Sequence, residues 1–375
     1  MDTSTLKYLF IQCQPSQLDA PFYGCLAQAM PNETLVILYN DSANVRRDID
    51  PELGFTPVFP DLDMDYITHW VNSGRGGVIR LIKKIIQLRP KWVILQDLRW
   101  TDKCVVALWC RFLGIGVAMR SDKNHLSEKV HSGFYLWCER FIVKILFDML
   151  CPVSEMTTDY YKWPVDRPIQ SFPYCTNEKK FTRPVSVSQV QRKIRSFFGI
   201  PNDAFIFLSV VKFVDRENPR AVIKAFERVV KIYPNTWLLM VGAGPNLESD
   251  QFYVKNLAIP NIVFAGYVPY IELENYFFSA DVFVHLARCE PWGISPQDAL
   301  LTGLGLIASN KVGSAVCHLA DGLSHFLVPV ENVDTATNKM MELINHKNIQ
   351  YLFEPAKAKV QDSFTTESVV KYWTA

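Results

Sequence analysis

The sequence predicts an α/β protein with two domains in tandem, each built on a parallel sheet covered by helices. The chain has 375 residues, which is more than one ordinary hydrophobic core holds. Apolar runs of strand length alternate with helix-period segments in the first half, and the same alternation starts again near Phe205. Between the two series lies a mixed polar stretch, residues 172–192, that contains two prolines.

In the first half, the alternation predicts strands at residues 8–11, 34–39, 92–96 and 116–119 and helices at 22–30, 78–88 and 103–113. Residues 42–65 are rich in proline and aspartate and are expected to form a long loop. This βαβα order favours parallel strands, because a crossover helix returns the chain to the same end of the sheet.

The second half predicts strands at 205–211, 237–241, 262–265, 281–286 and 306–308 and helices at 219–232, 271–278 and 295–302. Two Rossmann-like domains are therefore expected to face each other across a cleft, residues 1–178 forming the first and 179–360 the second. Residues 361–375 are expected to form a C-terminal helix that packs back toward the first domain, with helical spacing at Val369, Val370 and Trp373.

Composition excludes several classes of protein. Hydrophobic residues make up 49% and charged residues 21% of the chain, a globular balance. The net charge of +1 gives no reason to expect nucleic-acid binding. The start of the chain is a poor signal peptide and no apolar stretch is long enough to span a bilayer, so a cytoplasmic, non-spanning protein is expected. Nine dispersed cysteines without a CxxC pair favour buried thiols over a metal site or a disulfide framework.

Residues 280–300 carry the densest signal for chemistry. A buried strand leads into a loop with Glu290 and Gly293, and a helix follows with Ser295 expected as its N-cap. A helix N-terminus entered through glycine binds anions, because unpaired N–H groups and the helix dipole point outward. A diphosphate fits there, while Glu290 can accept hydrogen bonds from sugar hydroxyls and Asp298 can reach a ribose. Asp298 as a mere capping-box acid for Ser295 stays an alternative.

This region resembles the GT-B glycosyltransferases of the GT4 type, which carry two glutamates separated by seven residues. Glu290 matches the first glutamate and Asp298 stands at the second. The resemblance is strong over residues 200–330. It implies a retaining, metal-independent transfer of a sugar from a nucleotide-diphosphate sugar, with Gly293, Ile294 and Ser295 at the donor.

A second donor-binding segment follows the strand at 205–211. The family usually carries an arginine there and a lysine five residues later, both at the donor diphosphate. Lys212 aligns with the arginine, but Glu217 reverses the charge of the lysine, with Arg216 beside it. The resemblance leaves two interpretations. Either Arg216 binds the donor diphosphate in place of the lysine, or the cationic grip on the diphosphate is weaker than in the family. Gly244 belongs to a GxGP turn common in the same family, which is weak evidence on its own.

In the first half, the loop after residues 116–119 contains Arg120, Asp122 and His125, our candidates for the catalytic side of the cleft. The family often carries a histidine or an acid in this loop near the reacting sugar, and Asp122 or His125 is expected to fill that role. The alternative, a solvated or locally hydrogen-bonded side chain, stays open. The resemblance implies that no metal or other cofactor acts beside the nucleotide-sugar co-substrate. The sequence agrees with this, since we interpret the DxD string of Asp61 and Asp63 as loop.

The helix at residues 78–89 has a basic face that is either an ordinary solvated face or a peripheral contact with anionic lipid. The expected partners are a nucleotide-sugar donor and a glycan, lipid-linked or protein acceptor, but no nucleic acid. Two other functions remain possible on the same fold. One is a catalytically silent partner subunit, suggested by Glu217 and Asp298, and the other is a sugar-nucleotide epimerase.

Overall fold

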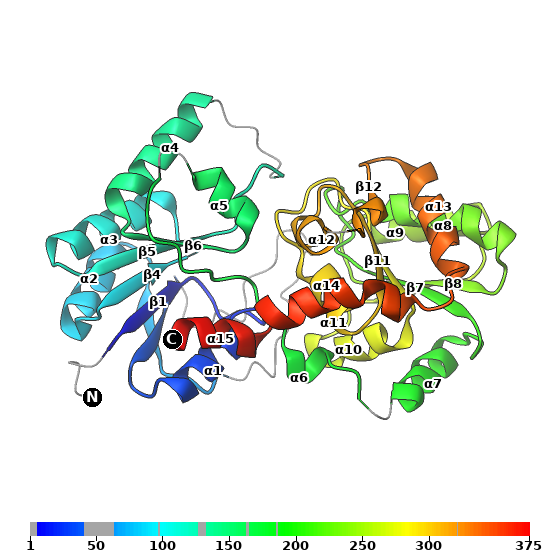
Figure 1. Ribbon diagram of the computed structural model, residues 1–375, viewed down its shortest axis with the longest axis horizontal. Helices are drawn as coiled ribbons and strands as arrows, with labels where there is room; N and C mark the ends of the chain where they lie inside the picture. Colours follow the sequence, from blue (N-terminus) through cyan, green and yellow to red (C-terminus); the bar gives the residue numbers. More distant parts are fainter. Residues whose placement is uncertain are drawn as a thin grey trace.

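The computed structural model describes residues 6–40, 64–96, 98–126, 133–162, 165–184, 187–320 and 322–375. These residues form two parallel six-stranded sheets side by side (Figure 1). The strand order is β3-β2-β1-β4-β5-β6 in the first sheet and, read from its far edge, β9-β8-β7-β10-β11-β12 in the second. Both sheets thus have the same doubly wound order, which confirms the prediction of two Rossmann-like domains.

The first sheet consists of β1 (Tyr8–Gln12), β2 (Thr34–Asn40), β3 (Thr68–Asn72), β4 (Trp92–Leu95), β5 (Gly116–Ser121) and β6 (Met149–Pro152). Its central strands β1 and β4 are apolar except for Gln12 at the end of β1, because helices cover both faces. One face packs against α2 (Gly77–Leu88), α3 (Trp100–Phe112), α4 (Gly133–Leu146) and α5 (Glu155–Tyr161). The opposite face packs against α1 (Ala20–Ala29).

The second sheet consists of β7 (Phe205–Val210), β8 (Thr236–Val241), β9 (Ile262–Gly266), β10 (Val282–His285), β11 (Gly305–Ser309) and β12 (Leu327–Val328). Its helices are α6 (Glu178–Phe181), α7 (Val187–Phe198), α8 (Pro219–Ile232), α9 (Leu247–Asn256), α10 (Tyr270–Ser279), α11 (Ile294–Leu301), α12 (Gly313–His318), α13 (Val333–Ile344) and α14 (Ile349–Ser363), and a short 3-10 turn, Ser324–Phe326, precedes β12. One hydrophobic cluster joins this sheet to its helices.

The last helix, α15 (Thr366–Thr374), returns to the first domain and lies beside α1 (Figure 1). The Trp373 ring packs 5.2 Å from the Tyr8 ring and 5.4 Å from the Phe10 ring. Where the chain crosses between the domains, the Thr176 N–H donates to Phe364 O and the Thr366 N–H donates to Thr176 O. The outgoing and returning crossings are therefore hydrogen-bonded to each other.

Three strands escape the sequence-based prediction, namely β3, β6 and the two-residue edge strand β12. β3 is a short edge strand with a mixed THWVN sequence, and β6 follows α4 so closely that both merge into one apolar run. Most of the expected loop at 42–65, with Asp61 and Asp63, lies outside the described residues. The domain boundary expected at 178/179 falls between the end of β6 and the start of β7 and stays a prediction. Within the described ranges, no helix has the length and apolar character needed to cross a bilayer.

Candidate functional site

A cavity of about 380 Å³ opens at the carboxyl edge of the second sheet. Its walls come from the segments after β7, β8 and β9, from the end of β10 and from the first turn of α11, and Gln17 of the first domain completes it. The strand order reverses between β7 and β10, and ligands of open α/β sheets bind at this switch point. The volume falls within the usual range of small-molecule sites.

The first turn of α11 faces this cavity through Gly293, Ile294 and Ser295. Gly293, not Ser295, is the N-cap, and no side chain caps the helix. The expectation that Ser295 caps α11 is therefore wrong. The glycine is required because its φ is +80° and a Cβ would lie 2.9 Å from Glu290 Cγ. An uncapped helix start presents backbone N–H groups and the positive end of the dipole, which suits an anion.

The backbone around Glu290 is fixed by the neighbouring loop after β11. The Glu290 N–H donates to Lys311 O at 2.9 Å, and the Gly313 N–H donates to Glu290 O at 3.0 Å. No side chain fits at Gly313, since a Cβ would lie 2.0 Å from Pro291 O. This packing holds the Glu290 carboxylate at the cavity wall, where it forms an ion pair with Arg216.

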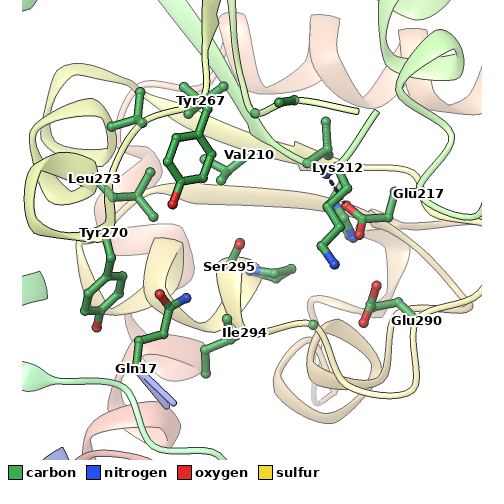
Figure 2. A pocket seen from close by; sticks show the side chains of 18 of the residues that line it. Gln17, Val210, Lys212, Glu217, Tyr267, Tyr270, Leu273, Glu290, Ile294 and Ser295 are labelled. Carbon is green, nitrogen blue, oxygen red and sulfur yellow. Dashed lines mark hydrogen bonds between the residues drawn. The ribbon is translucent and has the colours of Figure 1, made fainter. Parts of the chain in front are cut away.

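Lys212 follows β7, and its side chain points into the cavity beside Glu217 and Glu290 (Figure 2). The buried carboxylate of Glu217 accepts from the Lys212 backbone N–H at 2.7 Å and from Arg216 Nη2 at 2.9 Å. Glu217 thus anchors the two cationic residues. Burial, followed by the charge of Glu290, raises the pKa of Glu217 to about 7.

His285, at the end of β10, is a site residue that our sequence reasoning did not select. It lines the cavity, is only 3% exposed, and neither ring nitrogen has a hydrogen-bond partner among the described residues. Burial, with a smaller effect of Arg216, lowers the pKa of His285 to about 4, so the imidazole is neutral at pH 7. The available signal was a polar residue ending an otherwise apolar strand.

Residues 190–359 match the model of the family "Glycosyl transferases group 1". The chain also superposes on Anabaena HepE in complex with UDP with a TM-score of 0.77 at 14% identity, covering 98% of both chains. Sucrose-phosphate synthase of Thermosynechococcus elongatus gives a TM-score of 0.73 at 16% identity, covering 98% of this chain and 97% of that one. The second half of this chain is therefore similar to the group 1 glycosyltransferases, and the whole described chain shares the fold of HepE and sucrose-phosphate synthase.

Among curated relatives, this chain is similar to the alpha-monoglucosyldiacylglycerol synthase of Streptococcus pneumoniae, with 29% identity over 43% of this chain and 36% of that one. It is also similar to the GDP-mannose-dependent alpha-(1-6)-phosphatidylinositol monomannoside mannosyltransferase of Mycolicibacterium smegmatis, with 27% identity over 40% of this chain and 41% of that one. The matched segments thus span less than half the length of these relatives.

Asp298 differs from the second glutamate of the resembled family in residue type, and its side chain also lies away from the cavity. It is 3% exposed, does not line the cavity, and accepts from Thr176 Oγ1 at 2.7 Å. Burial raises the pKa of Asp298 to about 8. The expectation that Asp298 reaches the donor from α11 is corrected, because its carboxyl is enclosed by the domain crossing. It is also not a capping acid for Ser295. Gly244 does not line the cavity either. It packs against the backbone of Phe213, where a Cβ on residue 244 would lie 2.7 Å from Phe213 O.

Arg120 is likewise a buried structural residue and not a cavity residue, which corrects its expected catalytic placement. Its guanidinium donates to Asp19 Oδ1 at 2.6 Å, to Gln96 Oε1 at 2.7 Å and to the carbonyls of Phe172 and Pro173. Burial opposes its charged form, but Asp19 together with Tyr174 and Tyr23 raises the pKa of Arg120 above its ordinary value. Since Asp19 ends the loop that contains Gln17, Arg120 positions that loop.

Asp122 and His125 do not line the cavity either. The Asp122 carboxylate accepts from the Tyr174 hydroxyl at 3.2 Å, and the exposed His125 ring packs 5.4 Å from the Tyr160 ring. Between them, Asn124 Nδ2 donates to Pro291 O at 2.7 Å across the domains. The loop therefore docks beside Glu290, although its two candidate side chains point elsewhere. Within the described ranges, no three His, Cys, Asp or Glu side chains are placed to hold a metal ion.

Proposed function

We propose that this chain transfers a sugar from a nucleotide-diphosphate sugar to an acceptor, with retention of anomeric configuration and without a divalent metal. One observation carries the proposal. The cavity at the switch point brings Lys212, Arg216 and the uncapped start of α11 opposite Glu290. HepE, which shares the fold, is known in complexes with UDP and with UDP-glucose, and the curated relatives are by name a monoglucosyldiacylglycerol synthase and a GDP-mannose-dependent mannosyltransferase.

The two ends of the cavity differ in a way that suits the two ends of a nucleotide sugar. Tyr267, Tyr270 and Leu273 form an aromatic and apolar wall at one end (Figure 2). Lys212 and Glu290 lie at the other end with Glu217 (Figure 2). In the proposed orientation the base packs on the apolar wall, the diphosphate lies between Lys212 and α11, and the sugar reaches Glu290.

The chemistry follows from the charge that develops on the leaving group. When the bond between the anomeric carbon and the diphosphate oxygen breaks, negative charge accumulates on the diphosphate. Lys212 and the N–H groups of α11 are already in place to stabilise that charge, so little reorganisation accompanies the step. Glu290 accepts hydrogen bonds from the sugar hydroxyls and orients the ring. Retention is what the GT4 type implies for this geometry.

The acceptor is proposed to approach from the first domain, which supplies Gln17 to the cavity. A lipid-linked acceptor is favoured over a glycan or a protein, since the named relatives act on diacylglycerol and phosphatidylinositol glycolipids. We propose that the reaction takes place on the cytoplasmic side, which the cysteines spread from Cys13 to Cys317 without a CxxC pair support, because they fit a reducing compartment. The basic helix α2, at the position of residues 78–89, is proposed to touch the membrane.

One observation favours a second candidate, a catalytically silent partner subunit. Asp298 is withdrawn from the cavity and Glu217 stands where the family carries a lysine. Such a subunit would bind the nucleotide, if at all, without turning over any sugar nucleotide.

A screen of nucleotide sugars by thermal stabilisation, followed by product analysis with the stabilising donor, tests the proposal. Ligands that bind the folded state raise its stability in proportion to ln(1 + [L]/Kd). We expect stabilisation by at least one donor and transfer that is unchanged in EDTA. Stabilisation without any product points to the silent subunit, an altered free sugar nucleotide points to epimerisation, and activity that EDTA abolishes and Mg²⁺ or Mn²⁺ restores contradicts the metal-independent mechanism.

A further inference from the structure

The outer surface of the first domain has an apolar face that its own core does not use. On α3 the exposed residues Val105, Leu108, Trp109 and Phe112 recur at helical spacing. On the adjacent helix α4 the exposed residues Phe134, Trp137, Phe141 and Ile145 do the same. Phe112 is 81% and Phe134 75% exposed. We name these eight residues the outer stripe.

The outer stripe is separate from the residues that hold these helices on the sheet. α3 packs inward through Val106, Ala107 and Cys110, and α4 packs inward through Val143. The outer aromatic rings order one another instead, since Trp137 stacks on Phe141 with centroids 5.3 Å apart and rings 10° from parallel. Exposed aromatic and aliphatic residues gathered on two adjacent helices mark an interaction site.

The exposed charges around the outer stripe are mainly basic, and the partly exposed Asp148 pairs with Arg111. The neighbouring helix α2 has Arg80 and Lys83 on its exposed face and no acidic residue. The acidic residues of α3 and α4 are Asp102 and Glu139, and both are buried. The exposed basic residues beside the stripe are Arg80, Lys83, Arg89, Arg111 and Lys144. The helices α2, α3 and α4 cover the same face of the first sheet (Figure 1). The stripe residues and these basic residues are exposed, so both lie on the outer side of that helix layer.

We propose that this face lies on an anionic lipid surface, with the outer stripe at the boundary of headgroups and acyl chains and the α2 charges on lipid phosphates. Exposed aromatic residues beside Lys and Arg are the composition that interfacial elements use. Anionic lipids attract such basic residues. A second copy of this chain is a poorer occupant, since a two-fold contact would bring two basic surfaces together. The inference is independent of the donor cavity and places the membrane contact mainly on α3 and α4.

Flotation of the full chain with vesicles tests this, using equal parts phosphatidylcholine and phosphatidylglycerol, or phosphatidylcholine alone. We expect the chain to float with the mixed vesicles and only weakly with the neutral ones. Phe112→Gln and Trp137→Gln should each lower partitioning on the order of tenfold. Lys83→Gln and Lys144→Gln should each lower it roughly fivefold at low salt. Phe197→Gln, a control at a 78% exposed residue of α7, should change nothing.

The proposal is overturned if the wild type does not float with the mixed vesicles, or if Phe112→Gln and Phe197→Gln behave alike. It is also overturned if light scattering shows a dimer that Phe112→Gln splits, since a second copy would then cover the face. All these positions are exposed, so melting temperatures should stay at the wild-type value. Nucleotide binding by the same variants should be unchanged, which separates this proposal from that of the donor site.

Discussion

Replacing Asp298 by asparagine should change how the stability of the chain depends on pH. The folded state holds this carboxyl buried, with a pKa raised from 3.8 to about 8, so near neutral pH it carries a proton that the unfolded chain has lost. The folded state then binds more protons than the unfolded state, and the free energy of unfolding falls as pH rises from about 4 to about 8. Asparagine cannot ionise and removes this contribution.

The magnitude follows from the shift of the pKa. While folded Asp298 keeps its proton, each pH unit lowers the free energy of unfolding by about 1.4 kcal/mol. Near pH 8, half of the folded molecules still hold this proton. Between pH 6 and pH 8, Asp298 should therefore lower the free energy of unfolding by about 2 kcal/mol. Glu217, with its pKa raised to about 7, also lowers the free energy of unfolding as pH rises from about 4.5 to 7. This contribution of Glu217 is still present in Asp298→Asn.

Urea unfolding at pH 6, 7 and 8 measures this for the wild type, for Asp298→Asn and for a control, Asp362→Asn, at an exposed residue of α14. We expect the free energy of unfolding of Asp298→Asn to rise relative to that of the wild type as pH rises. Asp362→Asn should show the same pH dependence as the wild type. Nucleotide affinity should stay within about twofold of the wild type, since the carboxyl bonds Thr176 outside the cavity. Equal pH slopes for wild type and Asp298→Asn, or a large loss of affinity, would refute the reasoning.

Three further changes probe the cavity itself. The wild type should bind a nucleoside diphosphate about tenfold more weakly at pH 8 than at pH 6, because Glu217, with a pKa of about 7, ionises beside the phosphates. In calorimetric titrations, Glu217→Gln should abolish this pH dependence. An unchanged pH dependence in that variant would contradict the role of Glu217. His285→Phe should raise the melting temperature, because it removes two buried ring nitrogens that have no hydrogen-bond partner among the described residues. The same variant should bind nucleotide more weakly, and an unchanged affinity would show that His285 does not contact the nucleotide. Glu290→Gln should lower turnover on the order of a hundredfold with little change in melting temperature, and a wild-type rate would exclude a contact with the sugar.

The sequence was most informative where a residue's position follows from its local motif. Lys212 comes directly after a central strand, and Gly293 opens a helix after another, so both lie at the carboxyl edge once the sheet is parallel. The alternation of strands and helices likewise predicted both domains. β3 and β6 were missed because an edge strand needs little apolar character and a strand fused to a helix leaves no boundary in the pattern.

The sequence was least informative where a distant partner decides which way a side chain faces. Thr176 lies 122 residues before Asp298, and this hydroxyl holds the carboxyl away from the cavity. Asp19 lies 101 residues before Arg120 and draws that guanidinium into the core. Spacing along the chain identifies such residues as polar groups at a strand end or helix start, but it does not contain their partners.

Calorimetric titration of UDP, GDP and ADP into the wild type, Lys212→Ala and Lys224→Ala tests the central claim most directly. Lys224 is exposed on α8, outside the cavity, and serves as the matched control. We predict that at least one nucleotide binds the wild type with a Kd between about 1 μM and 1 mM. Lys212→Ala should weaken this binding roughly 10- to 100-fold through loss of a charged hydrogen bond, while Lys224→Ala binds like the wild type. Failure of all three nucleotides to bind, or equal affinities in the two lysine variants, would contradict a donor site at the carboxyl edge of the second sheet.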